Sequence, residues 1–297
     1  MKVLLTGATG FLGSALAKYW MQAGHELTLL VRPSSRLQRI ESLLPNVLVV
    51  TCHEGSDLKK IVQIASPDCV VHTACSYGRL GEPALQIFDT NVRLGMLLID
   101  AVLAAGKAPT CFINTATSLD SLAGNYALSK SQFSQWGDAL ARQNSDTLQF
   151  LNIRLQHMYG PGDDQSKFSS YVLHACHNNQ TELALTAGEQ QRDFIYIDDA
   201  VSAYDFILNN QGQFSTSDRV DVGSGDAPTV RKFVERVHSM LGSKTNLRFG
   251  AIPYRENEAM LCKADITRLR GLGWKPTYDL CRGIRKTIEL EFGICDC

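Results

Sequence analysis

Several features that would place the chain in a special class are missing from its sequence. No apolar run reaches the roughly 18 residues that a membrane-spanning helix needs. The 29 basic and 30 acidic residues are interspersed and leave a net charge of −1, which gives no sign of binding to nucleic acid or to an anionic membrane. Met1 leads directly into an apolar segment, with no pattern typical of a signal peptide. We therefore expect a globular, cytoplasmic protein whose partners include neither nucleic acid nor membrane.

Cysteine is present, but not in a pattern that indicates disulfides or metal. The nine cysteines include no Cys-x-x-Cys motif. The run from His174 to His177 contains possible ligands, yet it falls in a helical pattern and has no second cluster to complete a site. We expect reduced, non-catalytic thiols and no metal.

Apolar strands and helical patterns alternate through the first half of the chain. The strands are predicted at 3–5, 26–31, 47–51, 69–74, 110–114 and 148–155, and the longest helix is predicted at 86–105. Repeated strand–helix units predict the α/β class with a Rossmann-type, doubly wound parallel sheet. Further along, turns and isolated elements dominate, apart from one strand–helix unit at 193–209. We expect a first domain over 1–157 plus about 193–221, and a smaller second domain over about 158–192 and 222–297.

A glycine-rich turn follows the first strand. Gly7, Gly10 and Gly13 lie between that strand and a helical pattern. Such a turn lets backbone approach a pyrophosphate, and the helix N-terminus offers free N–H groups and the positive end of its dipole. The spacing differs from the commoner G-x-G-x-x-G, and an ordinary tight turn is the alternative. The turn predicts dinucleotide binding by Gly7, Thr9, Gly10, Phe11, Leu12 and Gly13.

Tyr126 and Lys130 are spaced so that they share one face of a predicted helix. A phenol ordinarily titrates near pH 10, and a lysine ammonium one turn away favours the phenolate and lowers that pKa. The pair therefore predicts a general acid/base suited to a carbonyl/alcohol couple. A match of this kind also arises by chance on solvated helix faces, but the glycine turn upstream favours the catalytic interpretation.

The end of the second strand is basic. Arg32, Ser35 and Arg36 follow it, and no carboxylate occurs until Glu41. An acid at this place binds the ribose 2′-hydroxyl of NAD, whereas arginine accommodates a 2′-phosphate with its planar donor fork. We therefore predict NADP(H) as the cofactor, held in part by these three residues. Solvated arginines without a ligand are the alternative.

In chain order, these motifs resemble those of the extended short-chain dehydrogenase/reductase superfamily of nucleotide-sugar epimerases, dehydratases and reductases. The matching stretches are the glycine turn, Val70–Ala74, Asn91-Val, the Tyr126/Lys130 pair, Arg192–Asp199 and Gly273–Pro276. The resemblance covers the whole chain and implies a homodimer that acts on a nucleotide-diphosphate sugar. It also implies that the cofactor is contacted by Ala74, Asn91, Tyr126, Lys130 and His157.

Three further stretches resemble the subfamily of CDP-paratose and CDP-abequose synthases, which reduce the 4-keto group of a CDP-3,6-dideoxyhexose. They are Arg154–Asp164, Gly188–Phe194 and Arg255–Met260. The resemblance implies a role in deoxysugar synthesis for surface polysaccharide. It assigns the substrate to Tyr77, Arg79, Thr117, Lys167, Arg192 and Arg255, with Arg192 and Arg255 as bidentate clamps on the diphosphate. A structural salt bridge is the alternative for each of these two arginines.

The superfamily also requires a serine or threonine hydroxyl beside the tyrosine. Thr115 and Thr117 stand at the end of the preceding strand; we expect Thr117 to be catalytic and hold Thr115 in reserve. The stretch from this strand to Tyr126 is shorter than in many relatives. Dehydratases carry an Asp-Glu pair directly after the threonine, whereas Ala116-Thr117 or Ser118-Leu119 occupies those positions here, which excludes dehydration.

Reduction and epimerisation at C4 remain. An epimerase keeps its NAD bound and returns the hydride, whereas a chain built for NADP(H) exchanges cofactor at each turnover, so we expect a reductase. A 4-epimerase with tightly bound NAD is the first alternative. A non-catalytic NADP-binding regulatory protein is the second, and the intact Tyr126/Lys130 pair argues against it.

Overall fold

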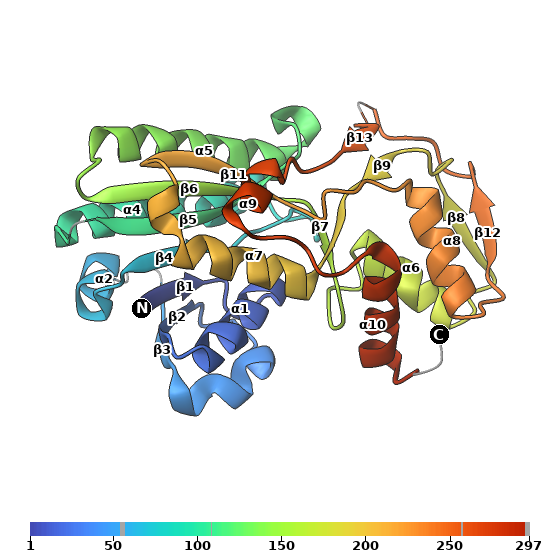
Figure 1. Ribbon diagram of the computed structural model, residues 1–297, viewed down its shortest axis with the longest axis horizontal. Coiled ribbons are helices and arrows are strands. Elements are labelled where there is room, and N and C mark those ends of the chain that lie inside the picture. Colours follow the sequence, from blue (N-terminus) through green and yellow to red (C-terminus); the bar gives the residue numbers. More distant parts are fainter. Residues whose placement is uncertain (54–56, 108, 257, 295–297) are drawn as a thin grey trace. The chain divides into compact units, whose positions relative to one another are not determined.

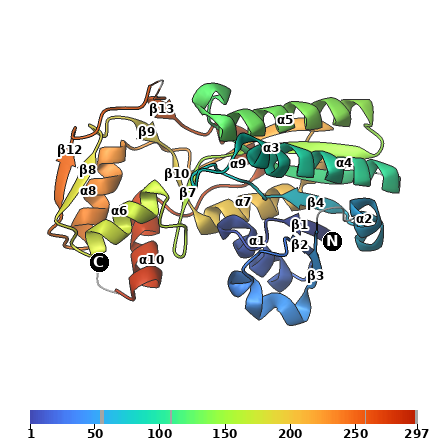
Figure 2. The same cartoon turned by 180° about the vertical axis from the view of Figure 1, so that it is seen from behind.

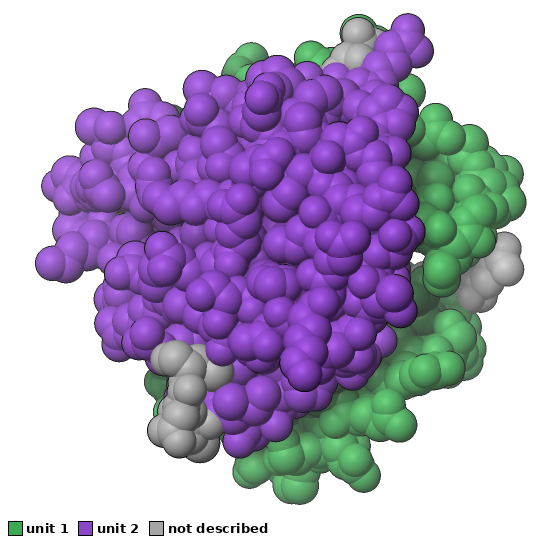
Figure 3. All heavy atoms as spheres, turned by 90° about the vertical axis from the view of Figure 1, so that its right-hand side faces the viewer, with its two compact units in different colours: residues 1–154, 204–220 green, residues 155–203, 221–297 purple. Residues whose placement is uncertain are grey.

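The computed structural model describes most of the 297-residue chain, namely residues 1–53, 57–107, 109–256 and 258–294. Contacts between residues divide it into two compact units, coloured separately in Figure 3. Unit 1 comprises Met1–Arg154 and Tyr204–Val220, and unit 2 comprises Leu155–Ala203 and Asp221–Cys297.

Unit 1 is built on a seven-stranded sheet with the order β11-β6-β5-β4-β1-β2-β3. The pairs of β1 with β2 and β4, of β2 with β3, and of β4 with β5 are all parallel. The strands are β1 (Lys2–Thr6), β2 (Glu26–Val31), β3 (Leu48–Thr51), β4 (Cys69–His72), β5 (Thr110–Thr117), β6 (Leu148–Leu155) and β11 (Ser217–Val222). The order reverses at β1, and ligands of such sheets bind at the carboxyl ends of the strands beside that switch point. The predicted doubly wound α/β fold is confirmed.

Helices cover both faces of this sheet (Figure 1). They are α1 (Phe11–Gln22), η1 (Gln38–Asn46), α2 (Leu58–Ala65), α3 (Ala84–Phe88), η2 (Asp89–Arg93), α4 (Leu94–Ala105), η3 (Ser121–Ala123), α5 (Asn125–Gln143), α7 (Ile197–Asn209) and η4 (Gln211–Gln213). Helices α3, α4 and α5 lie side by side (Figure 2). An aromatic cluster of Phe112, Phe133 and Phe150 is fully buried where α5 packs on β5 and β6, and it fixes the helix that carries Tyr126.

Among its described residues, unit 2 consists of short paired strands, four complete helices and the first half of α7. The strand pairs are β7 (His157–Tyr159) with β10 (Phe194–Tyr196), β8 (Glu182–Leu185) with β12 (Asn246–Phe249), and β9 (Gln191–Arg192) with β13 (Leu261–Cys262). The helices are α6 (Phe168–His177), α8 (Val230–Met240), α9 (Thr267–Leu272) and α10 (Leu280–Phe292). Stacked and edge-on rings of Tyr159, Phe194 and Phe233 form its core. No helix in the described ranges is long and apolar enough to cross a membrane.

The structure differs from the sequence-based expectation in three places. The helix predicted at 86–105 is interrupted by the π-helical turn η2. The strand of the 193–209 unit, β10, pairs with β7 and lies outside the large sheet. The seventh strand of the large sheet is β11, which the sequence did not predict. Contacts group residues 193–203 with unit 2, whereas the sequence assigned them to the first domain. The reason is that α7 has its first half in unit 2 and its second half in unit 1.

Candidate active site

The glycine turn has a geometry that only glycine satisfies. Gly7 has φ +71°, and a Cβ on it would lie 2.6 Å from the backbone nitrogen of Ala74. A Cβ on Gly13 would lie 2.2 Å from the carbonyl oxygen of Gly7. Gly10 caps α1 without a side-chain hydrogen bond, and the first turn of α1 holds no acidic residue. The N–H groups at this helix end therefore receive neither a capping side chain nor an acidic residue of the first turn, which leaves them available to a phosphate ligand.

Two other predicted residues of this turn differ in exposure. Thr9 is half-buried beside the exposed Gly10. Leu12 is only 7% exposed, so its side chain belongs to the core, and only its backbone can face a ligand.

The basic segment after β2 forms a tight turn. The Oγ of Ser35 accepts a hydrogen bond of 3.0 Å from the backbone nitrogen of Arg32, so this hydroxyl shapes the turn. Arg32 and Arg36 are exposed. The sequence analysis missed Arg39 on η1, whose guanidinium lies 6.0 Å from the ring centroid of Phe11 at the start of α1. Only the tertiary packing of η1 against α1 reveals that contact, because nothing in the spacing of Arg39 indicates it.

Lys130 is 1% exposed on α5, and its Nζ has no hydrogen-bond partner among the described residues. Burial lowers the pKa of this ammonium, and the nearby Cys75 thiol acts in the opposite direction. A buried amine without a partner is costly. The position therefore fits a polar ligand, such as a sugar hydroxyl, that accepts hydrogen bonds.

The pKa of Tyr126 corrects the sequence-based argument. Burial of the phenol, followed by the neighbouring Cys75, raises this pKa above its ordinary value, and the hydrogen bond with Thr117 and the Arg79 charge only partly oppose that rise. We expected Lys130 to lower the pKa, but desolvation dominates because a buried phenolate loses its hydration. Tyr126 is consequently protonated at neutral pH, as a proton donor must be.

The structure separates the two candidate threonines. Thr117 is hydrogen-bonded to the side chain of Tyr126. The hydroxyl of Thr115 instead lies 2.8 Å from the hydroxyl of Tyr204 on α7. The short stretch before Tyr126 is accommodated by η3 and by Gly124, whose φ of +130° leads directly into α5. Asp120, the first acid after the threonines, caps η3 by accepting a hydrogen bond from the backbone nitrogen of Leu122.

The amide of Asn91 is occupied by the protein itself. Its Nδ2 donates hydrogen bonds of 2.9 Å to the Ser76 carbonyl and to the Ser129 hydroxyl, and its Oδ1 accepts one of 2.7 Å from the Ser76 backbone nitrogen. Asn91 is fully buried in the π-helical turn η2. Its side chain therefore holds the segment after β4 against α5, and contact of Asn91 with the cofactor stays a prediction. Ala74, in the same segment, is half-buried beside the glycine turn.

The remaining predicted residues of unit 1 lie at Tyr126. The ring of Tyr77 stacks on that of Tyr126, with centroids 4.9 Å apart. The guanidinium of Arg79 lies 4.7 Å from the Tyr77 ring centroid. Unit 1 thus brings Thr117, Tyr126, Lys130, Tyr77 and Arg79 together at the carboxyl ends of β4 and β5.

Four predicted residues belong to unit 2. Arg192 forms an ion pair with Glu258, which the sequence analysis did not single out, and donates a hydrogen bond of 2.8 Å to the Gln191 carbonyl. Lys167 pairs with Asp163 at 2.7 Å. Arg255 is exposed, and His157 is half-buried in β7. The salt bridge that was the alternative for Arg192 is therefore present.

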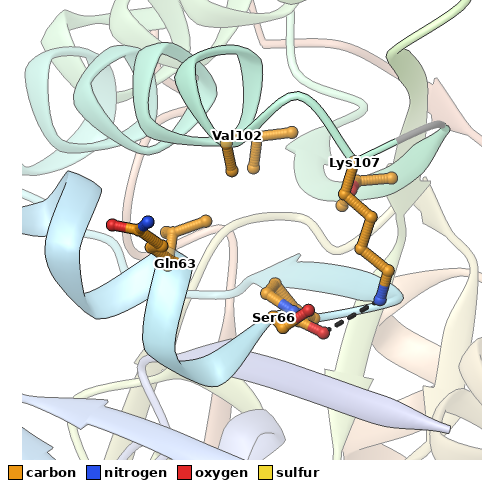
Figure 4. A pocket seen from close by; sticks show the side chains of 8 residues that line it. Gln63, Ser66, Val102 and Lys107 are labelled. Carbon is orange, nitrogen blue, oxygen red and sulfur yellow. Dashed lines mark hydrogen bonds between the residues drawn. The ribbon is translucent and has the colours of Figure 1, made fainter.

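A small cavity at the amino ends of the strands is separate from this site, which lies at their carboxyl ends (Figure 4). It lies at the amino ends of β4 and β5, where Lys107 donates hydrogen bonds to the Ser66 carbonyl and to Asp68. Its volume is about 60 Å³, far below the ~300–1,000 Å³ of pockets for drug-sized ligands. It is too small for a nucleotide.

The sheet, the glycine turn and the group of Tyr126, Thr117 and the buried Lys130 define a dinucleotide-binding protein of the Rossmann class. The NAD dependent epimerase/dehydratase family matches residues 3–223, and the chain belongs to this family. CDP-abequose synthase of Salmonella typhimurium is 30% identical over 97% of this chain and 97% of its own. CDP-abequose synthase of Salmonella muenchen is 30% identical over 98% of each chain. UDP-glucose 4-epimerase of Thermotoga maritima, solved with UDP-glucose, has the same fold, with a TM-score of 0.83, 19% identity and 98% coverage of both chains.

Proposed function

We propose that the chain is an NADPH-dependent reductase of the 4-keto group of a nucleotide-activated deoxysugar. The substrate we propose is CDP-4-keto-3,6-dideoxyglucose, reduced to CDP-abequose or CDP-paratose for surface polysaccharide synthesis. The observation that carries this proposal is the 30% identity to two CDP-abequose synthases over nearly the whole of each chain.

The residues of unit 1 fit a dinucleotide cofactor. The glycine turn and the start of α1 would hold its pyrophosphate, and Lys130 would donate to the nicotinamide ribose. Arg32 and Arg36, with Arg39 over Phe11, offer guanidinium groups to a 2′-phosphate, so we propose NADP(H) rather than NAD.

The bound cofactor supplies the hydride for C4 of the keto sugar. Tyr126 then gives its phenolic proton to the developing alkoxide oxygen, since burial keeps this phenol protonated. Thr117, hydrogen-bonded to Tyr126, holds the same oxygen. Lys130, one helical turn from Tyr126, would in its protonated form stabilise the phenolate that remains after the proton has left.

Within unit 1, Thr117 would contact the sugar. The resemblance assigns Lys167, Arg192 and Arg255, all in unit 2, to the nucleotide diphosphate and the groups near it. If Arg192 binds the diphosphate, its guanidinium would contact the diphosphate and Glu258 at the same time, because it already pairs with Glu258. His157 remains a proposed neighbour of the nicotinamide, without a role in proton transfer.

We also propose a homodimer formed through α3, α4 and α5. Large apolar side chains are exposed along these helices, including Leu85 at 70%, Phe88 at 43%, Leu97 at 43%, Leu128 at 43% and Trp136 at 55%. A second copy of the chain would bury them.

The test is an assay of purified protein with NADPH and a panel of 4-keto-6-deoxy and 4-keto-3,6-dideoxy sugars linked to CDP, dTDP or UDP. Loss of NADPH absorbance is followed, and the product is identified by NMR. We expect turnover of the CDP-linked 3,6-dideoxy substrate and no reaction with CDP-glucose, whose C4 is already an alcohol. A 4-epimerase would instead carry stoichiometric NAD after purification and invert C4 of a plain hexose nucleotide.

A further inference from the structure

Two aromatic rings and a guanidinium form a stack at the candidate active site. Tyr77 and Tyr126 lie with their ring planes at 30° and their centroids 4.9 Å apart. Arg79 places its guanidinium 4.7 Å from the centroid of Tyr77. The three residues come from two segments that are distant in sequence, because Tyr77 and Arg79 follow β4 while Tyr126 lies in the first turn of α5.

Tyr77 is itself 40% exposed, and its ring makes the contact with Tyr126. The neighbouring Cys75 raises the pKa of the Tyr77 phenol, desolvation and Tyr126 add to that rise, and the Arg79 charge opposes it. The ring of Tyr77 is thus the part that ties this residue to Tyr126.

The segment that carries Tyr77 is fixed independently of any ligand. The side-chain amide of Asn91 accepts a hydrogen bond from the Ser76 backbone nitrogen and donates one to the Ser76 carbonyl oxygen. It also donates to the hydroxyl of Ser129 on α5. Ser76 donates from its hydroxyl to Glu82 at 3.0 Å, and Glu82 also accepts from the backbone nitrogen of Leu80 at 2.8 Å. The Tyr77 ring is consequently held against α5, where Tyr126 begins.

We propose that Tyr77, with Arg79 over its ring, is a positioning residue for Tyr126. The inference rests on the proposed reductase function and adds to it a device that holds the proton donor against Thr117. An offset-stacked aromatic pair attracts beyond the area that it buries, and this attraction favours one orientation of the Tyr126 ring. The Arg79 charge also partly offsets the effect of burial on the phenol.

Substitutions at position 77 separate a positioning ring from a substrate contact. Y77F keeps the ring and removes the hydroxyl, whereas Y77L removes the ring at similar bulk. We expect Y77L to lower kcat by at least about tenfold, part of the ~10²–10⁴ that a general acid contributes, and to change KM by less than about threefold. Y77F should lose less than about threefold in kcat. A rise in KM of similar size in both variants, with kcat preserved, would overturn the proposal.

The charge of Arg79 is tested by the pH dependence of the reverse reaction, oxidation of the sugar alcohol by NADP⁺, in which the Tyr126 phenolate is the base. In this direction log kcat should increase with pH as Tyr126 loses its proton. R79Q should shift that increase to higher pH by about half a unit, so the rate at a fixed pH below it falls about threefold. R79K should restore the profile. An unchanged profile in R79Q, with only KM altered, would restrict Arg79 to substrate binding.

A measurement without substrate keeps this inference distinct from the proposed function. Tetranitromethane nitrates accessible tyrosines, and mass spectrometry gives the rate at Tyr126 itself. We expect slow nitration of Tyr126 in the wild type and in Y77F, and nitration at least about fivefold faster in Y77L, because the stacked ring shields one face. Equal rates in all three proteins would contradict the stack, whatever the enzyme's substrate is. A wild type that turns over no keto sugar but shows the expected nitration rates would contradict the proposed function alone.

Discussion

The polar residues predicted from the sequence are in different states in the two units. In unit 1, the Nζ of Lys130 is buried without a hydrogen-bond partner among the described residues. In unit 2, Arg192 pairs with Glu258 and Lys167 pairs with Asp163. Unfilled hydrogen-bonding capacity in unit 1 indicates a place built for a ligand, whereas the paired charges of unit 2 also serve its own fold.

Two carboxylates of unit 2 are likewise satisfied by hydrogen bonds within the protein. Asp193 is fully buried and accepts hydrogen bonds from the backbone nitrogens of Ser224, Gly225 and Ala264. Asp199 accepts from the backbone nitrogens of Thr277 and Tyr278. The stretch Arg192–Asp199, which resembles a superfamily motif, therefore ties the loops of unit 2 together through the carboxylates of Asp193 and Asp199.

The largest expected effect lies in unit 1. Tyr126→Phe removes the only group to which we assign proton donation and should lower kcat by ~10²–10⁴, while NADPH binding, measured by fluorescence titration, stays nearly unchanged. Retention of more than about a tenth of the wild-type kcat would remove Tyr126 from the mechanism.

The basic turn after β2 should distinguish the two nicotinamide cofactors. Arg32→Ala should weaken NADPH binding by ~1.5–3 kcal/mol, the contribution of a charged hydrogen bond, and barely affect NADH. Arg142→Ala, at the far end of α5, is a matched control that removes an arginine outside the proposed site. Equal losses for both cofactors would show that Arg32 does not contact the 2′-phosphate.

The paired arginine of unit 2 allows a direct test of its double role. Arg192→Ala should cost ~1–3 kcal/mol both in kcat/KM for the nucleotide sugar and in the free energy of unfolding, because it removes a ligand contact and leaves Glu258 unpaired. Glu258→Gln should lower stability without a comparable loss in kcat/KM. If both variants lose stability only, Arg192 is structural and the proposed diphosphate clamp is wrong.

A smaller effect concerns the pH dependence of stability. Burial, helped by the Lys130 charge, lowers the pKa of His72 to about 3. The unfolded chain therefore binds a proton that the folded chain excludes, and stability falls as the pH drops from about 6.5 toward 3. Urea unfolding at pH 7.5 and pH 5.0 should show about 1–2 kcal/mol less pH dependence in His72→Gln than in the wild type.

The exposed His177 provides the control for that measurement. His177→Gln should keep the wild-type dependence on pH. If His72→Gln and His177→Gln behave alike, then His72 is not the group that couples folding to pH.

The features that the sequence predicted are those carried by local patterns. Apolar strands alternating with helices predicted the sheet, and the spacing of the glycines and of the tyrosine–lysine pair predicted the turn and the shared helix face. The edge strand β11 escaped prediction because its sequence, Ser217–Val222, holds two aspartates, an arginine and a serine and only two valines.

The features that escaped prediction at the site depend on contacts between distant segments. The pairing of Thr115 with Tyr204, which leaves Thr117 for Tyr126, joins β5 to α7. The stack of Tyr77 on Tyr126 and the approach of Arg39 to Phe11 likewise require the assembled fold. The pKa of Tyr126 was misjudged because helical spacing shows the neighbouring lysine but not the desolvation of the phenol.

The central claim, hydride transfer from NADPH to C4 of a keto sugar, is tested most directly with deuterium. The purified protein is incubated with CDP-4-keto-3,6-dideoxyglucose and NADPH that carries deuterium on the transferable position of the nicotinamide, and the product is examined by NMR. We predict one deuterium at C4 of the sugar for each NADPH oxidised. A C4-inverted sugar without deuterium, formed with no NADPH consumed, would contradict the account and establish an epimerase.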